Sequence, residues 1–332
     1  MLSVNSEALA IAEKMIARAE QLDIQVSHLA CGARIIDAGI NAPGSWQAGK
    51  LIAEISLGGL GNVEFTPATF SADSAAGDGA GFWLPGVRVV ADHPVIACLS
   101  SQYAGWGIRR GDYFAIGSGP ARARAAVEPL FEQLAYRDSG EAAIIILEGR
   151  QWPTEEVAEY IARKCHIAPP GLTMILAPAS CLAGSFQLSA RVVATGMHKM
   201  LYLGFDFNQV QHGFGFCPIA PVVPEEDLAS SLANDCVLYG GRVHYTMSAS
   251  DEDIQALLKR MPSSASPSYG TPFYQIYQQY GNFYEVDKLT FCPAEISINN
   301  LESGNTFRAG KPHLGVLRRS LLGKEVTNTS AD

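Results

Sequence analysis

The feature that most limits how this chain can fold is a regular alternation of helical and apolar segments in its middle. Residues Ala142–Leu147 form a near-continuous apolar run, and Leu172–Ala177 form a second one. Helical patterns precede, separate and follow them at Pro120–Leu134, Thr154–Lys164 and Gly184–Leu201. A strand becomes apolar on both sides when helices cover both faces of its sheet. The pattern therefore predicts an α/β fold.

The rest of the chain adds further elements of the same mixed kind. Helices are predicted at Ser6–Leu22 and Asp251–Met261. Strands are predicted at Val87–Ala91, Val95–Ser100, Tyr113–Ile116, Cys236–Tyr239 and Arg242–Met247, with a hairpin at 295–299 and 306–308. These alternate with glycine- and proline-rich segments that are typical of turns.

No internal repeat and no low-complexity linker divides the chain, so any two domains must pack tightly together. We expect two tightly packed α/β subdomains. The first would combine residues 1–90 with residues 205–322, and the second would be formed by residues 91–204. The polar tail, residues 323–332, is expected to fray.

Charge and cysteine content narrow the classes of function. The chain has 24 Lys and Arg against 33 Asp and Glu, a formal charge of −9, and no basic cluster longer than a pair. Nucleic-acid binding needs a basic surface, so this partner is not expected. No apolar run reaches the roughly 18 residues that span a bilayer, and the N-terminus lacks the pattern of a signal peptide. Seven scattered cysteines predict neither disulfides nor a zinc site. We expect a cytoplasmic protein without a metal.

A glycine-rich turn, Gly117-Ser118-Gly119-Pro120-Ala121-Arg122, stands between a predicted strand and a predicted helix. Bare glycine backbone beside the free N–H groups of a helix start suits a polar or anionic ligand. Arg122 occupies the place where the dinucleotide-binding pattern G-x-G-x-x-G needs its third glycine, so a Rossmann site is not supported. An ordinary tight turn is the alternative interpretation.

Two other segments are candidates for the lining of a ligand site. Glu148 ends the most apolar strand, and carboxylates at strand ends often face the ligand crevice of α/β proteins. A solvated strand end explains Glu148 equally well. Ser101-Gln102-Tyr103, followed by Trp106, gathers hydroxyl, amide and aromatic groups in one turn, which suits a flat heterocycle. An aromatic turn at the edge of the core is the alternative.

The last predicted helix of the central stretch carries ionisable groups on an apolar surface. Gln187, Arg191, Ala194 and His198 follow at steps of four, three and four residues, so they share one helix face. A buried charge needs a partner, which makes Arg191 and His198 candidate site residues. An arginine that keeps its charged end in water is the alternative. The sequence contains no G-x-S-x-G, H-E-x-x-H or P-loop pattern.

Seven motifs carry a resemblance to a known family. In chain order they are Asp92-His93-Pro94-Val95-Ile96-Ala97-Cys98, Ser101-Gln102-Tyr103-Ala104-Gly105-Trp106, Gly117-Ser118-Gly119-Pro120-Ala121-Arg122-Ala123, Ser189-Ala190-Arg191-Val192-Val193, Ala220-Pro221, Asn234-Asp235-Cys236-Val237-Leu238-Tyr239 and Gly270-Thr271-Pro272-Phe273-Tyr274. With these motifs the chain resembles methenyltetrahydromethanopterin cyclohydrolase from about residue 3 to about residue 310.

The resemblance implies a cytoplasmic homotrimer whose subunits hold a pterin in a cleft between two α/β parts. It implies the reversible conversion of 5,10-methenyl- to 5-formyl-tetrahydromethanopterin, in methanogenic archaea and in bacteria that oxidise one-carbon compounds. No metal or redox cofactor is implied. The methenyl carbon belongs to an amidinium-like cation and is already electrophilic, so it needs only an oriented, deprotonated water.

The resemblance also implies roles for individual residues. Arg191 matches the family's catalytic arginine, which positions water or a base. Glu148 matches an acidic position associated with holding the pterin edge, where one carboxylate can accept two parallel hydrogen bonds. The Gly117–Arg122 loop and the Ser101–Tyr103 turn would line the cleft.

One position departs from the family pattern. Three residues after the arginine, where the family carries its catalytic glutamate, this chain has Ala194, and alanine cannot accept a proton. An engineered knock-out, a natural paralogue that binds without turnover, and a lineage that uses another base are competing explanations. His198 is the nearest titratable residue on the same face, although a structural histidine is the alternative. We expect the chain to bind the pterin and to hydrolyse it slowly or not at all.

Overall fold

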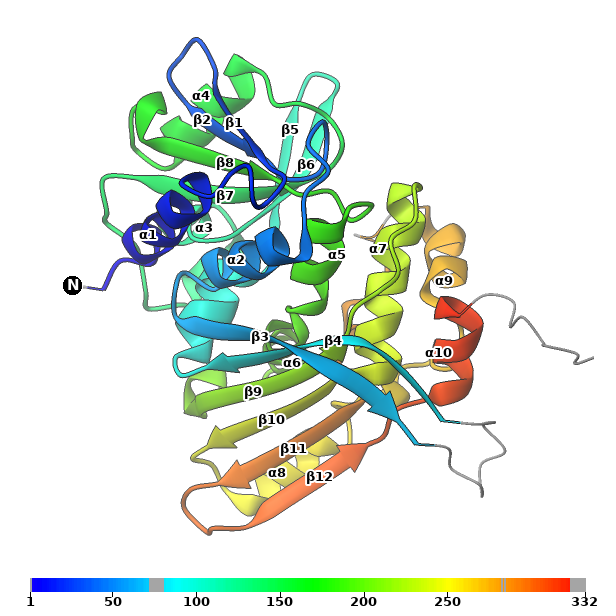
Figure 1. Ribbon diagram of the computed structural model, residues 1–332. Helices are drawn as coiled ribbons and strands as arrows, with labels where there is room; N and C mark the ends of the chain where they lie inside the picture. The colour runs from blue at the N-terminus through cyan, green and yellow to red at the C-terminus, as the bar shows by residue number, and fades with distance from the viewer. Residues whose placement is uncertain (1, 72–80, 282, 284, 323–332) are drawn as a thin grey trace, which may run out of the picture.

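Two six-stranded sheets, one above the other in Figure 1, organise the molecule. The computed structural model describes residues 2–71, 81–281, 283 and 285–322. Helices lie against both sheets, so the predicted α/β class is confirmed. The expected polar tail at residues 323–332 lies outside the described residues.

The first sheet, the upper one in Figure 1, contains a parallel centre with antiparallel edges. Its strands, in spatial order, are β1 (Gln25–His28), β2 (Arg34–Asp37), β8 (Leu172–Leu176), β7 (Ala143–Glu148), β6 (Tyr113–Ser118) and β5 (Trp106–Arg110). Strands β2, β8 and β7 are parallel, and the other pairings are antiparallel.

Helices cover both faces of the first sheet, as the uniformly apolar strands predict. Ile145 and Leu147 of β7 belong to a buried cluster with helix α4 (Glu155–Lys164). Ile144 and Ile146, which point the other way, join a cluster with α1 (Val4–Ile16) and α2 (Trp46–Ser56). Successive strand residues face opposite sides, so only double coverage keeps all four isoleucine and leucine side chains away from water.

The helices on this sheet begin where the local sequence supplies a hydroxyl cap. Ser3, Ser45 and Thr154 precede α1, α2 and α4, and each side-chain oxygen accepts a hydrogen bond from a backbone N–H of the first turn. Such caps satisfy N–H groups that have no partner within the helix. Helix positions at this sheet therefore follow from short-range sequence signals.

The second sheet is mostly antiparallel, with the β10–β11 pair parallel. Its strands, in spatial order, are β12 (Thr306–Gly310), β11 (Glu295–Asn300), β10 (Arg242–Met247), β9 (Val210–Pro218), β4 (Phe82–Ala91) and β3 (Gly61–Phe70). The hairpin predicted near the C-terminus is confirmed as β11 and β12.

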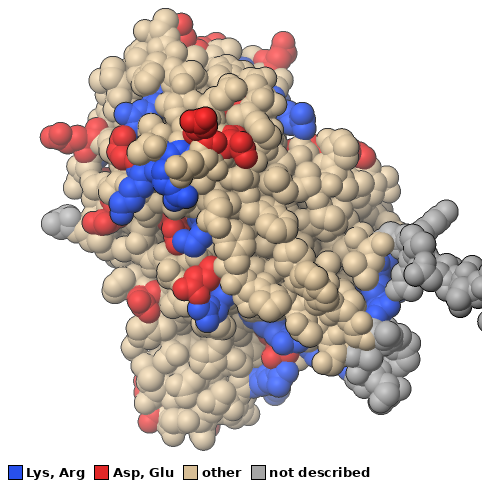
Figure 2. Space-filling view, viewed as in Figure 1, with Lys and Arg blue, Asp and Glu red and all other residues tan. Residues whose placement is uncertain are grey.

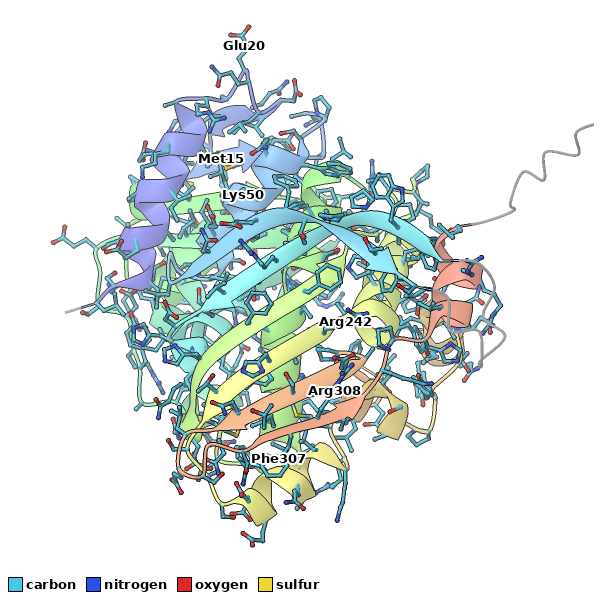
Figure 3. The ribbon with its side chains drawn as sticks, turned by 60° about the horizontal axis from the view of Figure 1, so that its bottom comes forward. Met15, Glu20, Lys50, Arg242, Phe307 and Arg308 are labelled. Carbon is cyan, nitrogen blue, oxygen red and sulfur yellow. The ribbon has the colours of Figure 1, made fainter. Side chains whose placement is uncertain are left out.

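One face of the second sheet forms the largest core, and the other face is open. The helices around this core are α6 (Val192–Tyr202), α7 (Glu226–Asp235), α8 (Asp251–Leu258), α9 (Phe273–Tyr280) and α10 (Leu314–Leu321). Figure 3 shows the open face, where Arg242 and Arg308 project from their strands. Helix α5 (Leu182–Ser189) lies between the two sheets and packs against α2 and β4.

The strand pairing distributes the chain differently from the expected grouping. Strands β1 and β2 pair with the central strands, although the sequence pattern placed residues 1–90 with the C-terminal part. A division into residues 1–90 plus 205–322 and residues 91–204 stays a prediction as a statement about domains. The tertiary pairing of β2 with β8 is a long-range contact that no local pattern reveals.

Two predicted strands are wrong, because each is a π-helix. The segment expected as a strand at Val95–Ser100 is the π-helix η1 (Val95–Gln102), and that expected at Cys236–Tyr239 is η5 (Cys236–Gly240). Short apolar runs do not distinguish a buried strand from a buried helix. The Pro94 that precedes η1 has helical φ and ψ, as a residue that starts a helix does.

Two predicted helices are interrupted. The segment Pro120–Leu134 holds only α3 (Ala121–Ala125) and a 3₁₀ turn, η2 (Pro129–Glu132), because Pro129 cannot continue a helix. The segment Gly184–Leu201 is split into α5 and α6, and Arg191 stands at the break with φ −82° and ψ 4°. Further 3₁₀ turns lie at Pro169–Gly171, Phe207–Gln209, Ser263–Ala265 and Lys288–Thr290.

Surface charge and helix length bear on nucleic acid and membrane as classes of partner. Figure 2 shows acidic and basic side chains mixed over this face of the molecule, without a broad basic patch. Among the helices of the described residues, none combines the length and apolar character that a membrane crossing requires.

Candidate functional site

The break between α5 and α6 places the Arg191 side chain between the two sheets, next to the ends of β6 and β7. Its Nη2 donates to Ser118 Oγ at 3.0 Å and to Gln187 Oε1 at 3.0 Å, and it forms an ion pair with Glu148. Ser118 ends β6 and Glu148 ends β7. The structure thus brings together three residues that the sequence proposed from separate motifs.

The position of the pair follows from strand register. Strands β6 and β7 are antiparallel and pair only between residues 116–118 and 146–148, so their C-terminal ends lie side by side. The Arg191 and Glu148 side chains are 12% and 14% exposed. A pair that is nearly buried gains from weak screening but must be well bonded to offset desolvation, and the bonds from Ser118 and Gln187 supply this.

The side chain of Ala194 is a methyl group, so it offers no polar atom to this site. It lies in α6, three residues after Arg191, and is 3% exposed within the core beneath the second sheet. The carboxylate that contacts Arg191 is therefore Glu148, which comes from the other sheet. The helix-face argument from sequence holds locally, because Gln187 and Arg191 are bonded across the α5–α6 break.

His198 lies among aromatic rings and is a poor proton acceptor. Its ring stacks on Tyr103 at 4.3 Å between centroids and meets Tyr202 edge-on at 4.5 Å. Burial, together with the smaller effect of the nearby cations Lys288 and Arg122, lowers the pKa of His198 to about 3. The geometry thus favours the structural interpretation of His198 over a substitute base.

His198 should make the folded state sensitive to acid. Its folded pKa is about 3 against 6.5 for a free histidine, so the unfolded chain binds the proton more tightly and stability falls as the pH drops below about 6.5. At pH 5 the loss is about 2 kcal/mol. Replacement by phenylalanine should retain the stacking on Tyr103. It should lower the difference in the free energy of unfolding between pH 7 and pH 5 by about 2 kcal/mol. Urea unfolding at both pH values measures it, and an unchanged difference would contradict the burial argument.

Ser101 and Gln102 belong to η1 and are fully buried. Ser101 Oγ donates to the carbonyl of Ser56, and Gln102 Nε2 donates to Ser56 Oγ at 3.1 Å. Tyr103, at the end of η1, is half-buried against His198. The predicted binding turn is therefore a helix end, and its hydroxyl and amide groups anchor η1 to α2.

Arg122 is a structural residue rather than an open cleft residue. It is fully buried, its Nε and Nη2 bond both oxygens of Glu128 at 2.7 and 2.8 Å, and its Nη1 donates to the carbonyls of Leu99 and Ser101. Those carbonyls end η1, where the helix has no partner for them. The prediction that Arg122 contacts substrate is not supported by this geometry.

The glycines of the same loop are explained by packing. A Cβ on Gly117 would lie 2.9 Å from Ile145 Cδ1, and one on Gly119 would lie 2.6 Å from Ile146 Cδ1. Gly119 also has φ +98°, which side chains rarely adopt. These contacts favour the ordinary tight turn that the sequence left open, and Ser118 is the loop residue that reaches Arg191.

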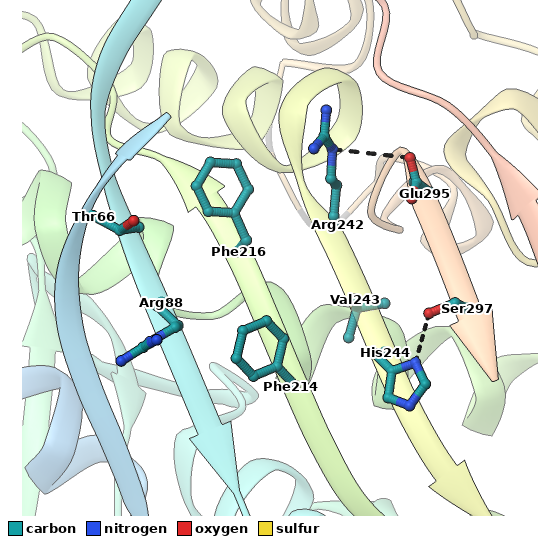
Figure 4. Close-up of a pocket in the computed structure, with 9 residues that line it drawn as sticks. All are labelled: Thr66, Arg88, Phe214, Phe216, Arg242, Val243, His244, Glu295 and Ser297. Carbon is teal, nitrogen blue, oxygen red and sulfur yellow. Dashed lines mark hydrogen bonds and ion pairs between the residues drawn. The ribbon is translucent and has the colours of Figure 1, made fainter. Parts of the chain in front are cut away.

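Two shallow hollows lie away from Arg191. One, of about 340 Å³, lies on the open face of the second sheet between Arg88, Phe214, Phe216, Arg242 and Glu295 (Figure 4). The other, of about 380 Å³, lies between Asp92–Ile96 and Val210–His212. The ligand cleft expected between the subdomains stays a prediction.

Sequence reasoning missed two partners that complete the arrangement. Glu128 fixes Arg122, although nothing in the sequence marks it. Gln187 was placed on the face of Arg191 without a role, and its spacing of four residues was the available signal. The guanidinium held beside a carboxylate, between two α/β layers, is the candidate functional site.

Comparison with known proteins identifies the family to which the chain belongs. The family model for cyclohydrolase (MCH) matches residues 3–321, and the chain belongs to this family. It is similar to methenyltetrahydromethanopterin cyclohydrolase of Methanocaldococcus jannaschii, with 42% identity over 325 residues that cover 97% of this chain and 98% of the relative. The enzyme of the same name from Methanococcoides burtonii is 40% identical over 330 residues, which cover 98% of this chain and all of the relative.

Proposed function

We propose that this chain is a hydrolase for cyclic amidines that converts 5,10-methenyl- to 5-formyl-tetrahydromethanopterin, reversibly, in one-carbon metabolism. Membership of the cyclohydrolase family supports the reaction. The observation that carries the assignment to a site is the Arg191 guanidinium, held beside Glu148 by Ser118 and Gln187. It supplies hydrogen-bond donors at the point where the two sheets meet.

The reaction needs few catalytic groups from the protein. Water adds to the electrophilic methenyl carbon, and one water proton leaves. The bond from that carbon to N10 then breaks as the second water proton moves to N10, which gives the 5-formyl product. Arg191 would orient the water, and Glu148 would accept hydrogen bonds from the N–H edge of the pterin. Because the substrate carbon already carries positive character, we propose that neither a metal nor a redox cofactor takes part.

Ala194 limits the rate in this proposal. The family position for a proton acceptor is filled by a methyl group that is 3% exposed, and the acidic pKa of His198 disqualifies it as a replacement. We propose that hydrolysis is impaired while pterin binding is retained. A non-catalytic pterin-binding homologue is the alternative, and turnover by the unmodified chain separates the two.

The remaining parts of the proposal concern assembly and location. We propose a homotrimer in the cytoplasm that binds a small-molecule pterin, with neither nucleic acid nor membrane as a partner. The mixed surface charges support the exclusion of nucleic acid. Sedimentation of the purified chain tests the trimer directly.

Glu148→Gln should weaken binding of 5,10-methenyltetrahydromethanopterin. The carboxylate loses its charge, so the pterin edge loses charge-assisted hydrogen bonds, and we expect Kd to rise by about 10-fold to 100-fold. Titration of the intrinsic tryptophan fluorescence measures it. Glu64→Gln is the matched control, because Glu64 is also paired with an arginine but lies exposed on the second sheet. Failure of the unmodified chain to bind the pterin would overturn the proposed function.

A further inference from the structure

Three side chains at the α5–α6 break each keep one buried polar atom without a partner among the described residues. These atoms are Gln187 Nε2, Arg191 Nε and Gln102 Oε1. Gln187 and Gln102 are fully buried. A buried polar atom that lacks a hydrogen bond costs about 1–3 kcal/mol, so three of them around one break indicate a site that binds something polar.

The hydrogen bonds that Gln187 and Gln102 form show which atom of each side-chain amide is the oxygen and which is the nitrogen. They therefore also show which atom is left without a partner. Arginine only donates, so the Gln187 atom 3.0 Å from Arg191 Nη2 must be the oxygen, and its free atom is the NH₂ group. Ser56 Oγ donates to the carbonyl of Ala53, and the Gln102 atom that bonds Ser56 Oγ must therefore be the nitrogen. The free Gln102 atom is then an oxygen.

The side chains that carry the three free atoms are connected by hydrogen bonds at the α5–α6 break. Gln187 is bonded to Arg191 directly, and Gln102 Nε2 also lies 3.4 Å from the carbonyl of Ala190, the residue before Arg191. The site therefore offers N–H donors from Gln187 and Arg191 and one acceptor from Gln102. Two donors and one acceptor match a water molecule, which makes two to four hydrogen bonds in a buried position.

We propose that Gln187, together with Arg191 Nε, binds the oxygen atom that hydrolysis adds to the substrate. This rests on the proposed function above. In the forward direction the atom is the oxygen of the attacking water, and one hydrogen of that water bonds Gln102 Oε1. The oxygen forms a bond to the methenyl carbon, and one water proton is released to solvent. The carbon–N10 bond then breaks, N10 keeps the electron pair and takes up the proton of the resulting hydroxyl group, and the oxygen becomes the formyl oxygen. The same donors then hold the formyl oxygen of the product.

The two forms of the substrate separate this role from simple support of Arg191. The 5-formyl form carries the added oxygen, and the 5,10-methenyl form lacks it. Loss of the Gln187 donors should therefore weaken binding of the formyl form selectively. A residue that only positions Arg191 should affect both forms alike.

Gln187→Met, which has the same length and no donor, is the test variant. We expect the ratio of Kd for 5-formyl- to Kd for 5,10-methenyl-tetrahydromethanopterin to rise by about 10-fold. Ser118→Ala is the matched comparison, because it also removes an acceptor 3.0 Å from Arg191 Nη2 but leaves the Gln187 donors in place. We expect it to shift both Kd values together. Gln255→Met on the exposed side of α8 controls for the substitution itself.

The outcomes are distinct. An unchanged ratio in Gln187→Met, with both ligands bound, overturns this inference and leaves the proposed function standing. If the unmodified chain binds neither pterin, the proposed function fails and this inference fails with it. Should Gln187→Met not fold, Gln187→Glu retains an acceptor for Arg191 but presents no donor, and an unchanged Kd for the neutral formyl form then overturns the inference. If the unmodified chain interconverts the two ligands during the titration, turnover is measured in place of binding. A kcat of Gln187→Met within twofold of that of the unmodified chain then overturns the inference.

Discussion

Ala194→Glu is expected to raise the rate of methenyl hydrolysis by about 10²-fold to 10⁴-fold, which is the usual contribution of a positioned general base. Residues three apart on a helix are neighbours, and α6 begins directly after Arg191. The new carboxylate would therefore lie near the guanidinium that Glu148, Ser118 and Gln187 already hold. Loss of the methenyl absorbance measures the rate.

The control for this change is Ala194→Gln, which has nearly the same size and polarity but does not accept a proton at neutral pH. Any gain that comes from hydrogen bonding or packing alone should appear in both variants. A rate for the glutamate variant no higher than that of the glutamine variant would refute the role assigned to position 194. It would then favour the non-catalytic homologue as the description of this chain.

Arg122→Leu is expected to destabilise the fold by about 3–5 kcal/mol, the range found when one partner of a buried ion pair is removed. The Arg122 side chain is fully buried, and the Glu128 side chain is 9% exposed. Without the guanidinium, the Glu128 carboxylate and the carbonyl of Leu99 would lose these donors, and the carbonyl of Ser101 would keep the N–H of Gly119 as its donor. Urea unfolding measures the change.

Arg88→Leu provides the comparison for that experiment. Arg88 pairs with Glu64 on the open face of the second sheet, where the two side chains are 47% and 45% exposed. Water and salt screen such a pair, so its loss should cost about 0–1 kcal/mol. Equal losses in the two variants would show that burial is not what makes the Arg122 pair important.

Prediction from sequence succeeded where neighbouring residues decide the structure. The isoleucines of β7 imply burial on both faces, and the helix predicted at Thr154–Lys164 is α4. The helix predicted at Ser6–Leu22 exists as α1, but it begins earlier, after Ser3, and ends at Ile16. It failed where an apolar run is short. Val95–Gln102 has no period long enough to separate strand from helix, and the π-helix there depends on Arg122, a residue more than twenty positions away, to bond its last carbonyls.

The candidate site shows the same division. Residue types and helix spacing selected Arg191, Ala194 and Glu148 as separate candidates, and the family motifs gave them roles. Local pattern also made Arg122 and the loop glycines candidates for ligand contact, whereas their burial and the packing of β7 against the loop favour a structural role.

Local chemistry in the chain therefore sets the helices, the buried strands, the family and the missing carboxylate at position 194. Those properties depend on residues within a few positions of one another. The tertiary structure alone decides that Glu148 is the partner of Arg191, that Arg122 is part of the core, and that Gln187 and Gln102 each keep a buried atom without a partner. Hydrogen-bond partners are assigned by contacts between segments far apart in sequence, and no periodicity encodes them.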